Sequence, residues 1–130
     1  MKEKYIQILM GLVALHSIAV GIGLLVLPFE YLAFFGFPNY PDNFFQAQGA
    51  VFHFVMSAAY IIAAINPKKY HVLLLFSFIA KMIATVFLIL YFLVISQIIT
   101  VLISGIFDCI LGVVIFYAYL QYSLNSHQNT

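Results

Sequence analysis

The sequence contains no arginine and no tryptophan, and only 7% of its 130 residues are charged. A soluble domain normally has about a quarter of its residues charged, and these build its polar surface. The lysines and acidic residues here leave a net charge of +1, with no basic patch that could neutralise nucleic-acid phosphates. These shortages argue against a soluble domain and against nucleic acid as a partner.

Cysteine is nearly absent too, because Cys109 is the only one. One cysteine excludes a disulfide within the chain and any CxxC-type redox or metal motif. The sequence also lacks GxSxG, HExxH, a glycine-rich phosphate loop and paired carboxylates within an apolar run. We therefore predict no metal site and no tightly held cofactor, and the chain shows no recognisable catalytic set.

Apolar residues make up 65% of the chain, and the mean hydropathy is +1.11. They form four runs, each long enough to cross ~30 Å of hydrocarbon at ~1.5 Å per residue. The first run is too long for a signal-peptide core, so we expect a retained helix. The sequence predicts one all-α membrane domain, residues 1–130, folded as a four-helix bundle. The expected helices cover about residues 5–27, 45–65, 70–95 and 97–120.

The lysines predict the orientation of the four spans. Lys2, Lys4, Lys68 and Lys69 all fall on the side that carries both termini. The loop of residues 28–44 contains no lysine. Cytoplasmic loops carry an excess of basic residues, so we expect both termini in the cytoplasm.

The loop between the first two spans is unusually aromatic. Residues 28–45 include eight aromatic residues and three prolines among eighteen positions. Aromatic side chains gather at the membrane–water interface because their rings are bulky and amphipathic. We expect an outer interfacial lid or short surface helix, and a gate for a substrate is the alternative.

Each predicted span has one ionisable residue near mid-membrane: His16, His53, Lys81 and Asp108. Ionisable residues at this depth are costly and usually face the interior of a bundle. Polar and small residues repeat on the same helical faces, as in the stripe of Leu12, His16, Ala19 and Gly23, so we expect all four residues to point inward. The supporting polar residues are Gln48, Ser57, Tyr60, Ser77, Thr85 and Ser104.

Lys81 and Asp108 are predicted to form an ion pair. The tight turn near Ser96 and Gln97 makes spans three and four antiparallel neighbours, and the two residues differ in depth by about 6 Å, which a lysine side chain can reach. The pair would fix the helix register, or alternatively handle protons or recognise a polar group. A metal site of His16, His53 and Asp108 is disfavoured because Lys81 would compete electrostatically.

Several motifs together resemble the DoxX-like group of small four-helix bacterial membrane proteins. They are Leu27-Pro28, Gly36-Phe37-Pro38, Gln48-Gly49-Ala50 and the segment from Tyr60 to Pro67, followed by Lys81 and Asp108. The resemblance covers about residues 5–120 and implies the fold more than a reaction. It also implies that the protein lies in a bacterial cytoplasmic membrane. Members of the group tend to have arginine where this chain has Gln48, and often where it has Lys81.

These features leave three hypotheses of function. The leading one is a non-enzymatic helix-packing module that associates with itself, or with a larger membrane complex, and can bind a lipophilic ligand such as a lipid or quinone-like molecule. The second is an intramembrane enzyme or redox component acting on a lipid, quinone or isoprenoid. The third is a minimal proton-coupled transporter, which would need oligomers because four helices enclose little space.

Overall fold

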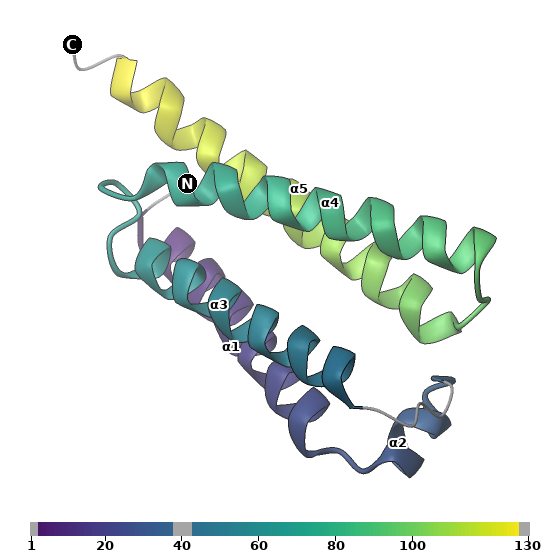
Figure 1. Cartoon of the computed structure of the whole chain (residues 1–130). Coiled ribbons are helices and arrows are strands. Elements are labelled where there is room, and N and C mark those ends of the chain that lie inside the picture. The colour runs from purple at the N-terminus through teal and green to yellow at the C-terminus, as the bar shows by residue number, and fades with distance from the viewer. Residues whose placement is uncertain (1–2, 38–42, 128–130) are drawn as a thin grey trace.

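The computed structural model describes residues 3–37 and 43–127 (Figure 1). Residues 38–42, in the middle of the predicted aromatic loop, and Lys2 lie outside this description. Four of the helices are long and apolar enough to cross a membrane, which confirms the predicted all-α class and the predicted number of long apolar helices. The helices are α1 (Glu3–Val26), α2 (Phe29–Phe34), α3 (Phe44–Ile65), α4 (His71–Val94) and α5 (Ile99–His127).

The helix ends follow from local sequence. The first span stops before Pro28 and the α3 helix stops before Asn66-Pro67, because proline disfavours helical backbone at the residue before it. The Asn66 side-chain oxygen then accepts a hydrogen bond from the Lys69 amide at 3.0 Å, which closes the turn. At the end of α4, the Tyr91 carbonyl accepts from the amides of residues 95 and 96 at 2.9 and 3.1 Å.

Two boundaries differ from the prediction. Helix α5 begins at Ile99 rather than 97, because the Ile98 amide folds back onto the Ser96 carbonyl at 2.8 Å and the turn needs these residues. It then continues to His127 rather than ending near 120. Residues 121–127 contain neither proline nor glycine, so nothing in them interrupts the helix.

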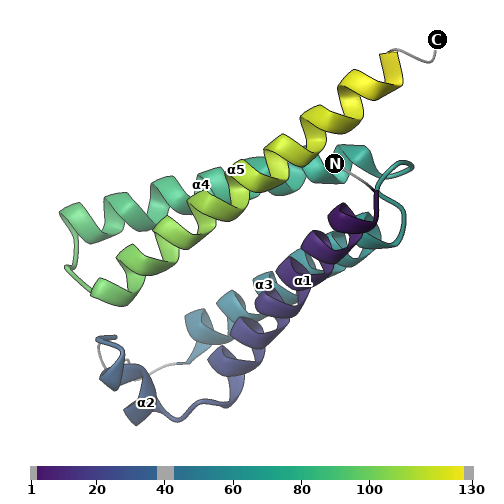
Figure 2. The same ribbon diagram turned by 180° about the vertical axis from the view of Figure 1, so that it is seen from behind.

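The four long helices form two antiparallel pairs rather than one evenly packed bundle. Helix α1 packs along α3, and α4 packs along α5, whereas contacts between the pairs are sparse. The pairs meet near the turn of residues 66–70 and diverge toward α2 (Figures 1 and 2). Apolar helices have no hydrophobic reason to close on each other in lipid, because lipid chains are as apolar as leucine. The sequence pattern alone therefore did not predict this divergence.

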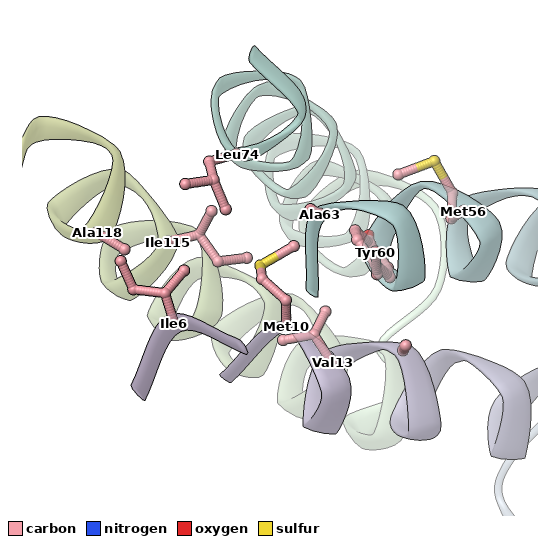
Figure 3. Packing of buried hydrophobic residues seen from close by; sticks show 10 residues of the cluster. Ile6, Met10, Val13, Met56, Tyr60, Ala63, Leu74, Ile115 and Ala118 are labelled. Atoms are coloured by element: carbon pink, nitrogen blue, oxygen red, sulfur yellow. The ribbon is translucent and has the colours of Figure 1, made fainter. Parts of the chain in front are cut away.

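An apolar cluster joins the two pairs at the end where they meet (Figure 3). Met10 of α1, Tyr60 of α3, Leu74 of α4 and Ile115 of α5 are all essentially buried in it. Each comes from a different long helix, so the cluster fixes the closed end of the arrangement. The other buried members are Ile6, Val13, Ala14, Met56, Ala63 and Ala118.

At the other end, the segment of residues 29–37 lies against the start of α5. The Thr100 hydroxyl donates a hydrogen bond to the Phe35 carbonyl. Gly36 turns the chain with φ +91°, and a Cβ placed on it would lie 3.2 Å from Ile98 Cγ2. The short helix α2 thus occupies part of the predicted aromatic loop, and the two residues that follow it, Phe35 and Gly36, contact the start of the second helix pair.

Candidate functional site

A cavity of about 640 Å³ lies between the two helix pairs. Helices α1 and α3 form its first wall, and helices α4 and α5 form its second wall. Both walls contribute polar groups. Phe37, from the segment after α2, also lines it. The polar lining consists of His16, Ser17, His53 and Tyr60 on the first wall, and Lys81, Ser104 and Asp108 on the second.

Lys81 and Asp108 form the predicted ion pair on the second wall, with the Lys81 ammonium donating to Asp108 Oδ1. The two side chains are 8% and 17% exposed, respectively. Burying either charge alone in an apolar interior is expensive, so each stabilises the other in this position. The ammonium has three N–H donors and the carboxylate has two oxygens, so the pair keeps hydrogen-bonding capacity for a third group.

Two glycines bring α5 close to α4 on either side of Asp108. A Cβ on Gly105 would lie 3.1 Å from Leu88 Cβ, and one on Gly112 would lie 3.3 Å from Lys81 Cβ. Close in space, the Thr85 hydroxyl donates across the helix pair to the Gly105 carbonyl at 3.3 Å. Small residues allow membrane helices to approach in this way. The close contact of α4 and α5 at Gly105 and Gly112 places the Asp108 carboxylate beside Lys81.

His53 on the first wall is held by two serines. The Ser17 hydroxyl, from α1, donates to the His53 backbone carbonyl at 3.0 Å, and its oxygen lies 3.2 Å from His53 Nδ1. The Ser57 hydroxyl, one turn further along α3, donates to the same carbonyl at 2.7 Å. This arrangement ties α1 to α3 beside the imidazole ring.

The serine contact also assigns the histidine tautomer. A serine hydroxyl has a single proton, and the Ser17 hydroxyl is placed to donate it to the carbonyl at 3.0 Å. His53 Nδ1 lies close to the Ser17 hydroxyl oxygen, and this contact is favourable when Nδ1 carries a proton and donates it. In a neutral imidazole the other nitrogen is then an acceptor. We assign His53 as the Nδ1–H tautomer, with Nε2 available to accept a hydrogen bond.

Tyr60 has a buried ring and an unused hydroxyl. The residue is only 2% exposed and lines the cavity. Within the described part of the chain, no hydrogen bond to its hydroxyl is found, and no fully inaccessible side-chain polar atom is left unsatisfied. The hydroxyl is therefore accessible from the cavity rather than sealed in the core. Buried tyrosines usually find a partner, so this group is ready to bind one.

His16 differs from the other three ionisable residues. It is exposed in the single chain, although it lines the cavity and its ring meets Phe107 of α5 edge-on, with centroids 5.0 Å apart. The predicted inward stripe was wrong for Leu12 and Ala19, which are also exposed. The buried face of α1 passes instead through Met10, Val13, Ala14, Ser17 and Gly21, about 140° around the helix axis from the predicted stripe.

The supporting polar residues fall into two groups. Tyr60 and Ser104 line the cavity. The others do not: Ser77 is buried but donates within α4 to the Leu73 carbonyl at 2.6 Å, and Gln48 is exposed on α3. Ser57 and Thr85 act through backbone carbonyls, as described above.

Sequence reasoning missed two residues of the site. Ser17 is not among the residues predicted for the site, although its position directly after His16 and four residues before Gly21 was an available signal. Phe107 precedes Asp108, and nothing in the sequence indicated that it would meet His16. Such contacts between non-adjacent helices leave no local pattern.

The charged groups on the second wall of the cavity interact electrostatically with the ionisable groups on the first wall. The charges of Lys81 and Asp108 act on both His16 and His53 across the cavity, and Asp108 also acts on Tyr60. The described residues contain no group of three or more His, Cys, Asp or Glu side chains placed to hold a metal ion. The arrangement provides hydrogen-bond donors, acceptors and one ion pair around an otherwise apolar space.

Comparisons of the chain with protein-family models, with curated proteins and with solved structures found no match in any of the three.

Proposed function

We propose that this membrane protein binds an amphipathic lipophilic molecule, with the polar end of the molecule held between the two helix pairs. The single observation that carries the proposal is the cavity itself, which has polar groups on both walls inside an array of apolar helices. Small-molecule sites combine an apolar lining with a few convergent polar groups in this way.

The size and access of the cavity support this proposal. A volume of about 640 Å³ falls within the roughly 300–1,000 Å³ of small-molecule pockets. Several lining residues are also exposed, including Phe52 at 57%, Phe87 at 60% and Ile103 at 59%. A lipophilic molecule could therefore reach the cavity from the surrounding lipid, with its apolar part against these side chains.

Native mass spectrometry of the purified protein tests the proposal. We expect the parent to retain a small lipophilic molecule from the membrane, and Ala84→Phe, which fills the cavity, to lose it. Ala58→Phe is the matched control, because Ala58 is exposed on α3 and does not line the cavity. The proposal fails if the parent retains nothing, or if both variants retain the same molecule.

A second candidate is an intramembrane enzyme acting on the bound lipid, quinone or isoprenoid. It is favoured by the presence of His53, Lys81 and Asp108 on the walls of one cavity, where they could transfer protons to and from a bound molecule. An enzyme would convert added ligand to a product of different mass, and the variant Lys81→Met/Asp108→Asn would bind ligand without converting it. A ligand recovered unchanged from the parent supports the binding function.

The membrane orientation remains a proposal of the same kind. The end of the molecule with α1's start and the turn of residues 66–70 carries Lys4, Lys68 and Lys69, whereas the α2 end carries Glu30. This distribution supports cytoplasmic termini, and a bacterial membrane is supported by the resemblance alone. The DoxX-like resemblance, transport, self-association and membership of a larger complex stay predictions from the sequence.

A further inference from the structure

We propose that the polar end of the bound molecule is an uncharged hydroxyl, so that the ligand class is a long-chain alcohol. This inference rests on the proposed binding function, and it adds the chemistry of the recognised group. The observations that carry it are the charge balance of the cavity wall and its unused hydrogen-bonding groups.

The charged groups of the lining cancel. Lys81 and Asp108 are paired with each other, and the other polar lining groups are hydroxyls and imidazoles. A carboxylate, phosphate or ammonium headgroup would bring a net charge into a membrane interior with no free counter-charge, and such a charge is strongly disfavoured there. A neutral headgroup avoids this cost.

The unused groups of the wall include both donors and acceptors. The Tyr60 hydroxyl and the remaining Lys81 N–H groups can donate, while His53 Nε2 and the second Asp108 oxygen can accept. In the described part of the chain these atoms have no assigned hydrogen bonds. A hydroxyl both donates and accepts, so it is the smallest neutral headgroup that satisfies one group of each kind. An ether or ketone accepts only.

The experiment uses five probes with the same sixteen-carbon chain: hexadecanol, its methyl ether, hexadecanoic acid, hexadecylamine and hexadecyl phosphate. An equimolar mixture is added to the delipidated full-length protein in detergent, and occupancy is read by native mass spectrometry. We expect hexadecanol to bind at least about fivefold more tightly than each of the others, because one additional satisfied hydrogen bond contributes about 1 kcal/mol and uncompensated charge disfavours the ionic probes.

A conservative variant tests the recognition directly. Tyr60→Phe removes only a hydroxyl with no assigned protein partner, so the fold is retained, and the affinity for hexadecanol should fall about fivefold. Tyr91→Phe is the matched control, because Tyr91 lies on α4 outside the cavity lining and should leave occupancy unchanged.

The outcomes separate this inference from the binding function itself. Equal or stronger binding of the ether or of any charged probe overturns the hydroxyl assignment, as does unchanged hexadecanol binding in Tyr60→Phe. If no probe binds but the parent retains a native molecule that Ala84→Phe loses, the hydroxyl assignment also fails while the binding function stands. If the parent neither retains a molecule nor binds any probe, both fail.

Discussion

Gly112 of α5 lies so close to Lys81 of α4 that a Cβ added to the glycine would sit 3.3 Å from the Lys81 Cβ. Gly105, three residues before Asp108, makes a similar approach to Leu88. The backbone contact on both sides of Asp108 sets the separation of the two helices. The ion pair therefore depends on glycines that carry no chemistry of their own.

Leucine at position 105 should disrupt the close packing of α4 against α5. Gly105→Leu forces a side chain against Leu88 Cβ and the nearby Ile89 backbone, and overpacking of this kind costs about 1–3 kcal/mol of unfolding free energy. Gly11→Leu is the control, because a Cβ at Gly11 has nothing within 4 Å. The unfolding free energies of the parent and both variants are measured in detergent micelles. Equal effects of the two substitutions would contradict the close packing described for α4 and α5.

Removing one member of the ion pair should destabilise the protein more than removing both. Lys81→Met or Asp108→Asn alone leaves an unpaired buried charge, at a cost of about 3–5 kcal/mol. The double variant has no charge to leave unpaired, so its unfolding free energy should return close to that of the parent. A double-mutant cycle of unfolding in micelles gives the coupling energy. Strictly additive effects would show that the two side chains do not interact.

Ser17→Ala should loosen α1 from α3 and release the His53 ring. The lost hydrogen bonds lower the unfolding free energy by about 1 kcal/mol. Nitrogen NMR of the imidazole should show an unprotonated Nε2 in the parent and mixed tautomers in Ser17→Ala. Ser57→Ala is the control, because its bond stays within α3 and does not reach the ring nitrogen. A protonated Nε2 in the parent would refute the tautomer assignment.

Gly36→Ala should detach the segment of residues 29–37 from α5. Its φ of +91° is unfavourable for alanine by about 1–2 kcal/mol, and the added Cβ meets Ile98 at 3.2 Å. We expect faster amide hydrogen exchange in residues 29–37, with little change in α3 or α4. Gly23→Ala, whose Cβ would make an ordinary 3.6 Å contact, should exchange like the parent. Unchanged exchange in Gly36→Ala would mean that this contact does not hold the segment.

Labelling of single cysteines tests the orientation. In a Cys109→Ala background, Lys69→Cys and Glu30→Cys place thiols at opposite ends of the molecule, both exposed. A membrane-impermeant thiol reagent added to intact cells should label position 30 and not position 69 until the cells are lysed. The reverse pattern would invert the proposed topology.

Much of the fold was predictable because membrane spans have strong local signals. Length and hydropathy indicated four spans, and Pro28 and Asn66-Pro67 indicated where two of them end. The short connection near Ser96 made α4 and α5 antiparallel neighbours, so the depths of Lys81 and Asp108 were enough to predict their ion pair. The end of α5 was not predicted, because residues 121–127 are mostly polar and polar residues can remain helical.

The sequence by itself determined the four apolar helices, the ends that proline marks and the position of each ionisable residue along its helix, because these depend on residues close together in the chain. Only the tertiary structure decided that the long helices form two diverging pairs. It also decided that His16 is exposed at the edge of the cavity, and that the Tyr60 hydroxyl is accessible from the cavity. A leucine-rich face packs as well against lipid as against another helix. The separation of non-adjacent helices therefore depends on a few specific contacts distributed over the whole chain.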